Sequence, residues 1–271
     1  MNLLRFIVYS NILVSFAAAS ISYSFCHLQE IENKNWYSLF VFFSTLLTYN
    51  AQRIIKRRQD QKDWSTGRLL WIKKNSILLY TFSIISATCT SWIYFKYLYQ
   101  LHSFIFLIPL ALISIFYALK LGNLKNLREI PHLKIHLIAF VWVASTVLFP
   151  AINEEITNSF TLYFSAAFYL YILAITVPFD IRDLNFDNPG NKTVPQVFGI
   201  SIAKKIALIT LLASLIIFFY ILPDIQKAIA LTFALLIPAI LIQQTDIKKP
   251  EMYFSGLIDG AIILLSLSLI V

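Results

Sequence analysis

Long apolar runs separated by shorter polar stretches recur from one end of this chain to the other. Nine apolar segments can be delimited, each long enough to cross about 30 Å of hydrocarbon as a helix rising about 1.5 Å per residue. The ten-residue alternation of membrane barrel strands is absent, so the segments predict helices, which satisfy their own backbone hydrogen bonds in lipid. Their approximate limits are 3–25, 36–53, 75–97, 101–119, 134–151, 159–178, 203–222, 226–243 and 253–271.

Composition strengthens this interpretation and excludes several other classes of protein. Of the 271 residues, 58% are hydrophobic and 13% are charged, whereas about 25% are charged in an ordinary soluble domain. A disordered chain, an ordinary cytosolic enzyme and a coiled coil are therefore excluded. The 2 cysteines form neither a metal-binding pattern nor a disulfide framework. We expect one all-α, polytopic membrane domain over residues 1–271, and we expect the first segment to be a retained helix rather than a cleaved signal peptide.

Basic residues predict the orientation of the spans. The net charge is +8, and of the 22 Lys and Arg residues all but Lys34, Lys96 and Lys227 fall on one predicted side. That side consists of the N-terminus and the loops 54–74, 120–134, 179–205 and 244–252. The positive-inside rule places it in the cytoplasm, and we expect a bacterial-type inner membrane. Topology and contacts with anionic lipid or phosphate account for the basic excess, so nucleic acid is not an expected partner.

Acidic residues are concentrated after the sixth apolar segment, in the stretch 178–195. Asp180, Asp183 and Asp187 follow the pattern D-x-x-D-x-x-x-D, whose spacing predicts one shared helical face. Three crowded carboxylates repel one another unless a cation neutralises them, and Mg²⁺ typically binds one or two carboxylates together with substrate phosphates. We therefore predict that the three aspartates are catalytic and bind Mg²⁺, and that Lys192 contacts phosphate. The alternative is a solvated acidic loop balanced by neighbouring basic residues.

This stretch resembles the second aspartate-rich motif of the UbiA superfamily of intramembrane prenyltransferases. In that family the three aspartates precede a basic residue, T-L-P and a downstream glycine. The corresponding residues here are Lys192, Thr193, Val194, Pro195 and Gly199. The layout of nine helices is also similar, although the resemblance is sharp only over about 178–205. It implies a UbiA-like helical bundle around an apolar chamber. It also implies transfer of an isoprenoid from a polyprenyl diphosphate to a hydrophobic or aromatic acceptor in the lipid bilayer, with Mg²⁺ as cofactor.

A second match to the family is partial. The family's loop after the fourth helix often carries Y-x-x-x-K, which helps to bind diphosphate. The closest residues here are Tyr117 and Lys120, with the shorter spacing Y-x-x-K. The resemblance assigns both to diphosphate binding. The alternative makes Tyr117 an interfacial aromatic residue and Lys120 a determinant of topology.

The first family motif, N-D-x-x-D-x-x-x-D, is degenerate in this chain. Asn50 is retained, but the expected aspartates are replaced by Ala51, Ile54 and Arg58. Arg53 and Arg57 are four residues apart, and arginine can bind phosphate through paired hydrogen bonds in place of a metal. Arg68 falls roughly where the family carries an arginine, so we assign Asn50 and these three arginines to the diphosphate. The alternative is that the basic stretch anchors the loop to anionic headgroups.

Four functions remain open at this point, one of which, a transporter, is the least favoured because the spans are nearly free of charge. Mg²⁺-dependent prenyl transfer is the leading hypothesis, and a terpene cyclase of the UbiA type is a close alternative. The degenerate first motif favours a third function, a non-catalytic membrane protein that binds a prenyl diphosphate. The acceptor, the prenyl chain length and the oligomeric state are left open.

Overall fold

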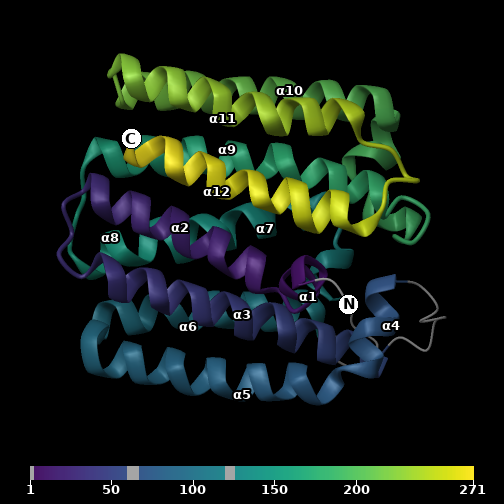
Figure 1. Ribbon diagram of the computed structural model, residues 1–271, viewed down its shortest axis with the longest axis horizontal. Coiled ribbons are helices and arrows are strands. Elements are labelled where there is room, and N and C mark those ends of the chain that lie inside the picture. The colour runs from purple at the N-terminus through teal and green to yellow at the C-terminus, as the bar shows by residue number, and fades with distance from the viewer. Residues whose placement is uncertain (1–2, 60–66, 120–125) are drawn as a thin grey trace.

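A computed structural model of the protein describes residues 3–59, 67–119 and 126–271. Within these residues the chain is almost entirely helical and contains no strand, which confirms the predicted all-α class. The long helices run side by side along one direction and form a single bundle, with α10 and α11 at one edge and α5 and α6 at the other (Figure 1).

The helices follow the predicted apolar segments, with short additional elements at the charged loops. Their bounds are α1 Leu3–Tyr9, α2 Ile12–Leu28, α3 Lys34–Gln59, α4 Gly67–Lys74, α5 Ser76–Ile93, α6 Leu101–Ala118, α7 Leu133–Val143, α8 Phe149–Asn153, α9 Ser159–Arg182, α10 Val194–Ile221, α11 Ile225–Gln244 and α12 Asp259–Ile270. Three π-helical segments lengthen their neighbours: η1 Tyr94–Leu98, η3 Ala144–Leu148 and η5 Tyr253–Ile258. Two short 3₁₀ turns complete the structure: η2 Leu127–Glu129 and η4 Pro189–Asn191.

Within the described residues, 7 helices are long and apolar enough to cross a membrane, and the bent pair α1 and α2 makes an eighth if it is one span. The protein is therefore an integral, multi-pass membrane protein. The predicted count of nine is not confirmed. The segment expected at 36–53 does form helix α3, but polar residues near both of its ends, such as Lys34 and Arg53, lower its hydropathy.

The first predicted helix is broken, in contrast to the single helix expected at 3–25. Helices α1 and α2 meet at an angle of 69°. Asn11 lies at the break with φ 68°, a left-handed conformation that asparagine tolerates better than most residues. The Asn11 side chain is buried. The break therefore places a polar side chain inside the bundle, close to one end.

Helix α10 begins well before its predicted start at residue 203. The Gln196 side chain accepts a hydrogen bond of 2.9 Å from the Thr193 backbone N–H, and Pro195 occupies the first turn, where its missing N–H is harmless. A kink at Gly199, with φ 77°, interrupts the helix. The loop that carries the acidic motif is consequently compact, because α9 also continues to Arg182.

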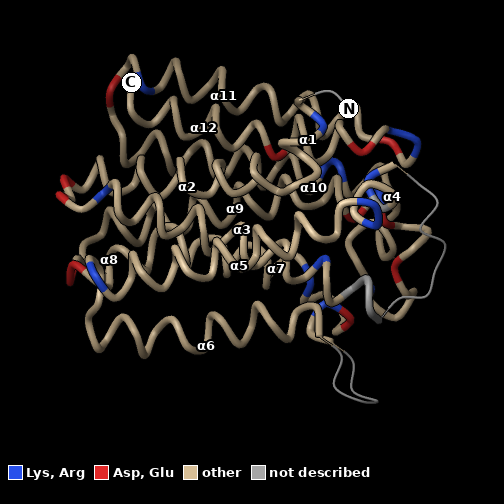
Figure 2. The backbone as a smooth tube through the Cα atoms, turned by 60° about the horizontal axis from the view of Figure 1, so that its bottom comes forward, with Lys and Arg blue, Asp and Glu red and all other residues tan. Residues whose placement is uncertain are grey.

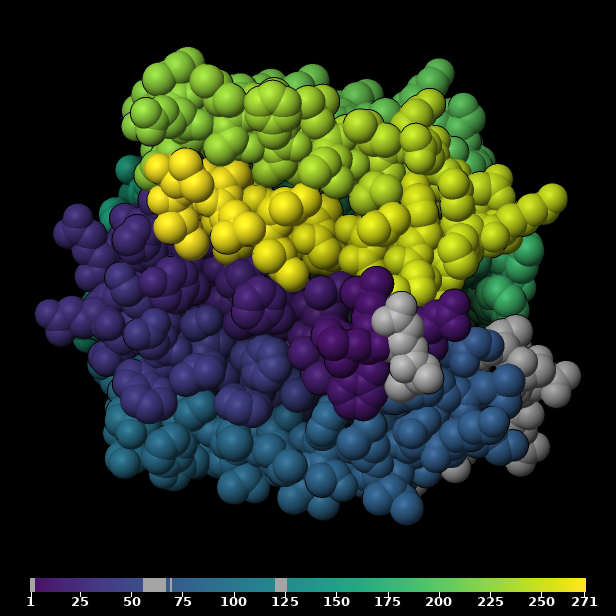
Figure 3. Space-filling view, in the orientation of Figure 1, coloured from purple at the N-terminus to yellow at the C-terminus, as the bar shows by residue number. Residues whose placement is uncertain are grey.

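Aromatic side chains fill the centre of the bundle, where Phe25, Phe149, Phe164 and Tyr171 are fully buried. The outer helices present large apolar side chains instead. Exposed examples on α5, α6, α10 and α11 are Ile84, Leu112, Ile209 and Phe233. Figure 3 shows side chains packed closely across the face formed by α11, α12, α2, α3 and α5. Apolar side chains on the outside are expected where the surrounding solvent is lipid rather than water.

Candidate functional site

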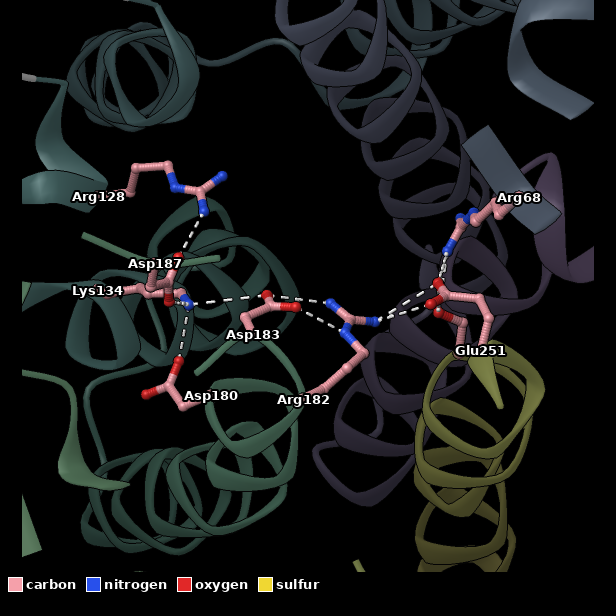
Figure 4. Close-up of polar contacts among 9 residues, drawn as sticks. Arg68, Arg128, Lys134, Asp180, Arg182, Asp183, Asp187 and Glu251 are labelled. Atoms are coloured by element: carbon pink, nitrogen blue, oxygen red, sulfur yellow. Dashed lines mark hydrogen bonds and ion pairs between the residues drawn. The ribbon is translucent and has the colours of Figure 1, made fainter. Parts of the chain in front are cut away.

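Charged residues gather at the two ends of the bundle and are almost absent between them (Figure 2). At the end where α9 finishes and α12 begins, eight charged side chains are linked by ion pairs (Figure 4). We call them the ionic network: Arg68, Arg128, Lys134, Asp180, Arg182, Asp183, Asp187 and Glu251. These residues come from α4, η2, α7, α9, the loop after α9 and the segment just before η5. The network therefore connects parts of the chain that are far apart in the sequence.

The three predicted aspartates, which we call the acid triplet, converge on one cation. That cation is the ammonium group of Lys134. Its Nζ lies 2.8 Å from Asp180 Oδ1, 2.5 Å from Asp187 Oδ2 and 3.9 Å from Asp183 Oδ2. Asp180, Asp187 and Lys134 are buried. The acid triplet therefore points into the protein, and a solvated acidic loop does not describe it.

Asp187 does not share a helical face with the other two aspartates, so that prediction is wrong. Helix α9 ends at Arg182, and Asp183 is the next residue. The chain then makes one isolated α-turn, in which the Asp187 backbone N–H donates a 2.8 Å hydrogen bond to the carbonyl of Asp183. This turn, rather than a continuous helix, places Asp187 near Asp180 and Lys134.

Arg182 fixes the orientation of Asp183. Its Nε and second terminal nitrogen lie 2.8 Å and 3.2 Å from the two carboxylate oxygens of Asp183, a paired arrangement. Burial alone would raise the pKa of Asp183, but the charge of Arg182, with Lys134 and Arg128 behind it, lowers that pKa to about 2. Asp183 is therefore ionised at neutral pH.

Glu251 extends the network towards α4 and was not predicted from the sequence. Its carboxylate lies 3.0 Å from Arg68 and 3.3 Å from Arg182. Burial raises the pKa of Glu251, but Arg182, Arg68 and Arg53 outweigh burial and lower it. The available signal was weak: Glu251 is an acid in a basic loop, immediately before the last span.

Arg68 connects the network to the broken first helix and to Asn50. It donates a 2.6 Å hydrogen bond to Asn11 Oδ1, and Asn11 Nδ2 donates a 2.7 Å hydrogen bond to Asn50 Oδ1. Because arginine has donors only, Asn11 must present its oxygen to Arg68 and its amide to Asn50. Asn50 uses its oxygen in this arrangement, and its buried Nδ2 has no hydrogen-bond partner among the described residues. The buried Nε of Arg68 also has none among them. Both atoms are donors.

Arg53 lies one turn after Asn50 on α3 and is partly exposed. Within the described part of the chain it has no hydrogen bond or ion pair. It experiences the like charges of Arg68 and Arg182 and the opposite charges of Glu251 and Asp183. An unpaired guanidinium near two others is a site of net positive potential.

The other predicted residues lie at the same end with fewer contacts. Tyr117 lies in the last turn of α6 and is half-buried. Lys192 follows η4 in a left-handed conformation, is exposed, and forms no ion pair with the acid triplet. It lines a cavity of about 70 Å³ together with Lys134 and Asp180. Lys120 and the side chain of Arg57 are outside the described residues.

The predicted magnesium site does not fit the side chains as they are placed. Among the described residues there is no group of three or more His, Cys, Asp or Glu side chains that could hold a metal ion. Mg²⁺ requires oxygen ligands at about 2.0–2.1 Å. The point between the acids is already taken by Lys134 Nζ, 2.8 Å from Asp180 and 2.5 Å from Asp187. Magnesium therefore stays a prediction from the sequence resemblance.

Comparison of the chain with protein-family models, with curated proteins and with solved structures gives no match. The class of the protein therefore has to be taken from its fold and its site. The protein is a multi-pass membrane protein, all-helical in the described residues, with a partly buried ionic network at one end of its bundle.

Proposed function

We propose that this protein binds a polyprenyl diphosphate at the end of the bundle that holds the ionic network and transfers the isoprenoid to a hydrophobic or aromatic acceptor within the membrane. The observation that carries the proposal is that, among the described residues, the guanidinium of Arg53 has no ion pair and the nearby Asn50 Nδ2 and Arg68 Nε have no hydrogen-bond partner. A group of donors without acceptors at the end of an apolar bundle suits a ligand with an anionic head and a hydrocarbon tail.

The proposed chemistry follows from these donors. Arg53 and Arg68 would bind diphosphate oxygens through charge-assisted hydrogen bonds, and Asn50 would add a neutral donor. When the bond between the isoprenoid carbon and the diphosphate oxygen breaks, negative charge develops on the leaving group. Donors fixed in place before the reaction stabilise that charge and lower the barrier. The resulting allylic cation would alkylate the acceptor.

The acid triplet supports this arrangement from the opposite side of the network. Asp183 holds Arg182 at 2.8 Å, and Asp187 holds Arg128 at 3.2 Å. The resemblance of the stretch 178–205 to a prenyltransferase motif points in the same direction. The basic loops favour a cytoplasmic position for this end of the bundle, in a bacterial-type inner membrane.

One observation favours a second candidate, a non-catalytic protein that binds a prenyl diphosphate. Lys134 occupies the place between the acids that the family resemblance assigns to a metal, 2.8 Å from Asp180. The first motif has also lost its aspartates. A protein that retained binding and lost turnover would show both features.

The test uses the purified protein in lipid nanodiscs with farnesyl or geranylgeranyl diphosphate and Mg²⁺, with and without aromatic acceptors. Binding is measured by calorimetry and turnover by pyrophosphate release. Release that depends on an acceptor and disappears in Asp183→Asn, but not in the control Lys248→Ala, supports prenyl transfer. Release without an acceptor indicates a cyclase, and binding without release indicates the non-catalytic protein. If the wild-type protein binds neither diphosphate, the proposal is wrong.

A further inference from the structure

Lys134 is held between the three acids by the fold itself. It is the second residue of α7, and its side chain is 8% exposed. An ammonium group has three N–H donors, and three carboxylates surround this one. Lys134 Nζ donates a hydrogen bond to Asp187 and forms ion pairs with Asp180 at 2.8 Å and with Asp183 at 3.9 Å. One lysine therefore faces all three acids.

The chain's own cations also occupy the remaining oxygens of the triplet. Arg182 covers both oxygens of Asp183, and Arg128 lies 3.2 Å from the second oxygen of Asp187. Only Oδ2 of Asp180 has neither a hydrogen bond nor an ion pair within the described residues. A divalent ion bound at this one free oxygen would lie beside the positive charge of Lys134, which repels it.

We propose that Lys134 is the resident cation of the acid triplet and that diphosphate binding by this protein requires no divalent metal ion. The choice of ligand rests on the proposed function, but the role of Lys134 does not. The charge that neutralises the diphosphate comes chiefly from Arg53, on the far side of the network, because Glu251 already neutralises Arg68. The lysine, together with Arg182 and Arg128, balances the negative charges of the three acids, so that they do not repel the incoming anion.

Metal binding can be measured directly, without any substrate. Mn²⁺ is titrated into the protein in nanodiscs, and the electron paramagnetic resonance signal of free Mn²⁺ reports how much is bound. We expect the wild type and Lys134→Arg to bind no Mn²⁺ at the triplet. We expect Lys134→Gln to bind it, and the double variant Lys134→Gln/Asp183→Asn to lose it again. Mn²⁺ binding by the wild type that Asp183→Asn abolishes would overturn the proposal.

A second measurement needs only the wild type, and therefore decides even if Lys134→Gln does not fold. The dissociation constant for farnesyl diphosphate is measured with Mg²⁺ and again with EDTA in its place. We expect the two values to agree within about threefold; a larger loss of affinity in EDTA contradicts the proposal. A wild type that binds no farnesyl diphosphate in either buffer refutes the proposed function, and the Mn²⁺ titration then still tests Lys134.

Discussion

Replacing Glu251 by glutamine should tighten the binding of a diphosphate while it weakens the fold. Glu251 neutralises Arg68 at 3.0 Å and Arg182 at 3.3 Å, and its charge also reaches Arg53. Glutamine has almost the same shape but no charge. In Glu251→Gln the three guanidinium groups would therefore lack their shared counterion, which a bound diphosphate can replace.

The size of both effects can be worked from the charges. A unit charge at roughly 6–8 Å with an effective dielectric constant of about 20 contributes about 2–3 kcal/mol. The Glu251 side chain is 27% exposed, so solvent screening reduces the gain to about 1.5 kcal/mol, or about tenfold in the dissociation constant. Breaking a fully buried ion pair costs about 3–5 kcal/mol, and for this partly exposed group we expect a loss of about 2 kcal/mol in stability.

The gain in diphosphate affinity and the loss of stability are measured separately on the same preparation. Calorimetry in nanodiscs gives the dissociation constant for farnesyl diphosphate, and intrinsic fluorescence during heating gives the unfolding midpoint. Asp246→Asn is the matched control, because Asp246 is an exposed carboxylate in the same loop and its loss removes the same net charge. A folded Glu251→Gln protein that binds the diphosphate no better than the wild type would refute this electrostatic reasoning.

Three further predictions follow from other contacts. Arg53→Ala should weaken farnesyl diphosphate binding by about 1.5–3 kcal/mol, more than Lys248→Ala, because only Arg53 is placed beside other unpaired donors; equal calorimetric affinities would mean that the basic stretch only sets topology. The pKa of Asp183 falls to about 2 in the folded protein, below its unfolded value of about 3.9. The ionised carboxylate stabilises the fold above about pH 4, and this stabilisation is lost as the pH falls towards 2. The Asp183→Asn protein should therefore lose less stability than the wild type over this pH range, as measured by acid unfolding followed by circular dichroism. Asn11→Gly keeps the left-handed backbone but removes the amide that accepts from Arg68 at 2.6 Å; the unfolding midpoint should fall by an amount equivalent to about 2–3 kcal/mol, and an unchanged midpoint would show that the amide is dispensable.

The sequence predicted the helices well where long apolar runs define them. The segment expected at 101–119 is α6, Leu101–Ala118, and the one expected at 226–243 is α11, Ile225–Gln244. The errors lie where local hydrogen bonds override hydropathy. The early start of α10 depends on the side chain of Gln196, and the break between α1 and α2 depends on the left-handed backbone of Asn11. Neither effect leaves a trace in an apolar periodicity.

The candidate site was predicted in part: the three aspartates, Asn50 and Arg68 were named from the sequence, whereas Lys134 and Glu251 were not assigned to it. The acid triplet converges as expected, and Asn50 and Arg68 join the same polar chain through Asn11. Lys134 was counted only as a charge that sets the orientation of the spans. Its position in the first turn of an apolar segment is a signal, because a lysine there can extend its long stem into the bundle. Which acids it meets depends on how α7 packs against α9, and that requires the fold.

The two halves of the site differ in how completely their charges are paired, and this difference determines where an anion can bind. Around Lys134 nearly every carboxylate oxygen faces a cation, so an anion that entered there would have to separate ion pairs, some of them buried, which costs several kcal/mol. Around Arg53 the pairing is less complete: among the described residues Arg53 has no ion pair, and Asn50 Nδ2 and Arg68 Nε have no hydrogen-bond partner, although Arg68 is also paired with Glu251. An anion placed there would therefore separate fewer ion pairs. An aspartate at position 51 or 54, as in the resembling motif, would neutralise these donors, so the proposed diphosphate site depends on the absence of those aspartates.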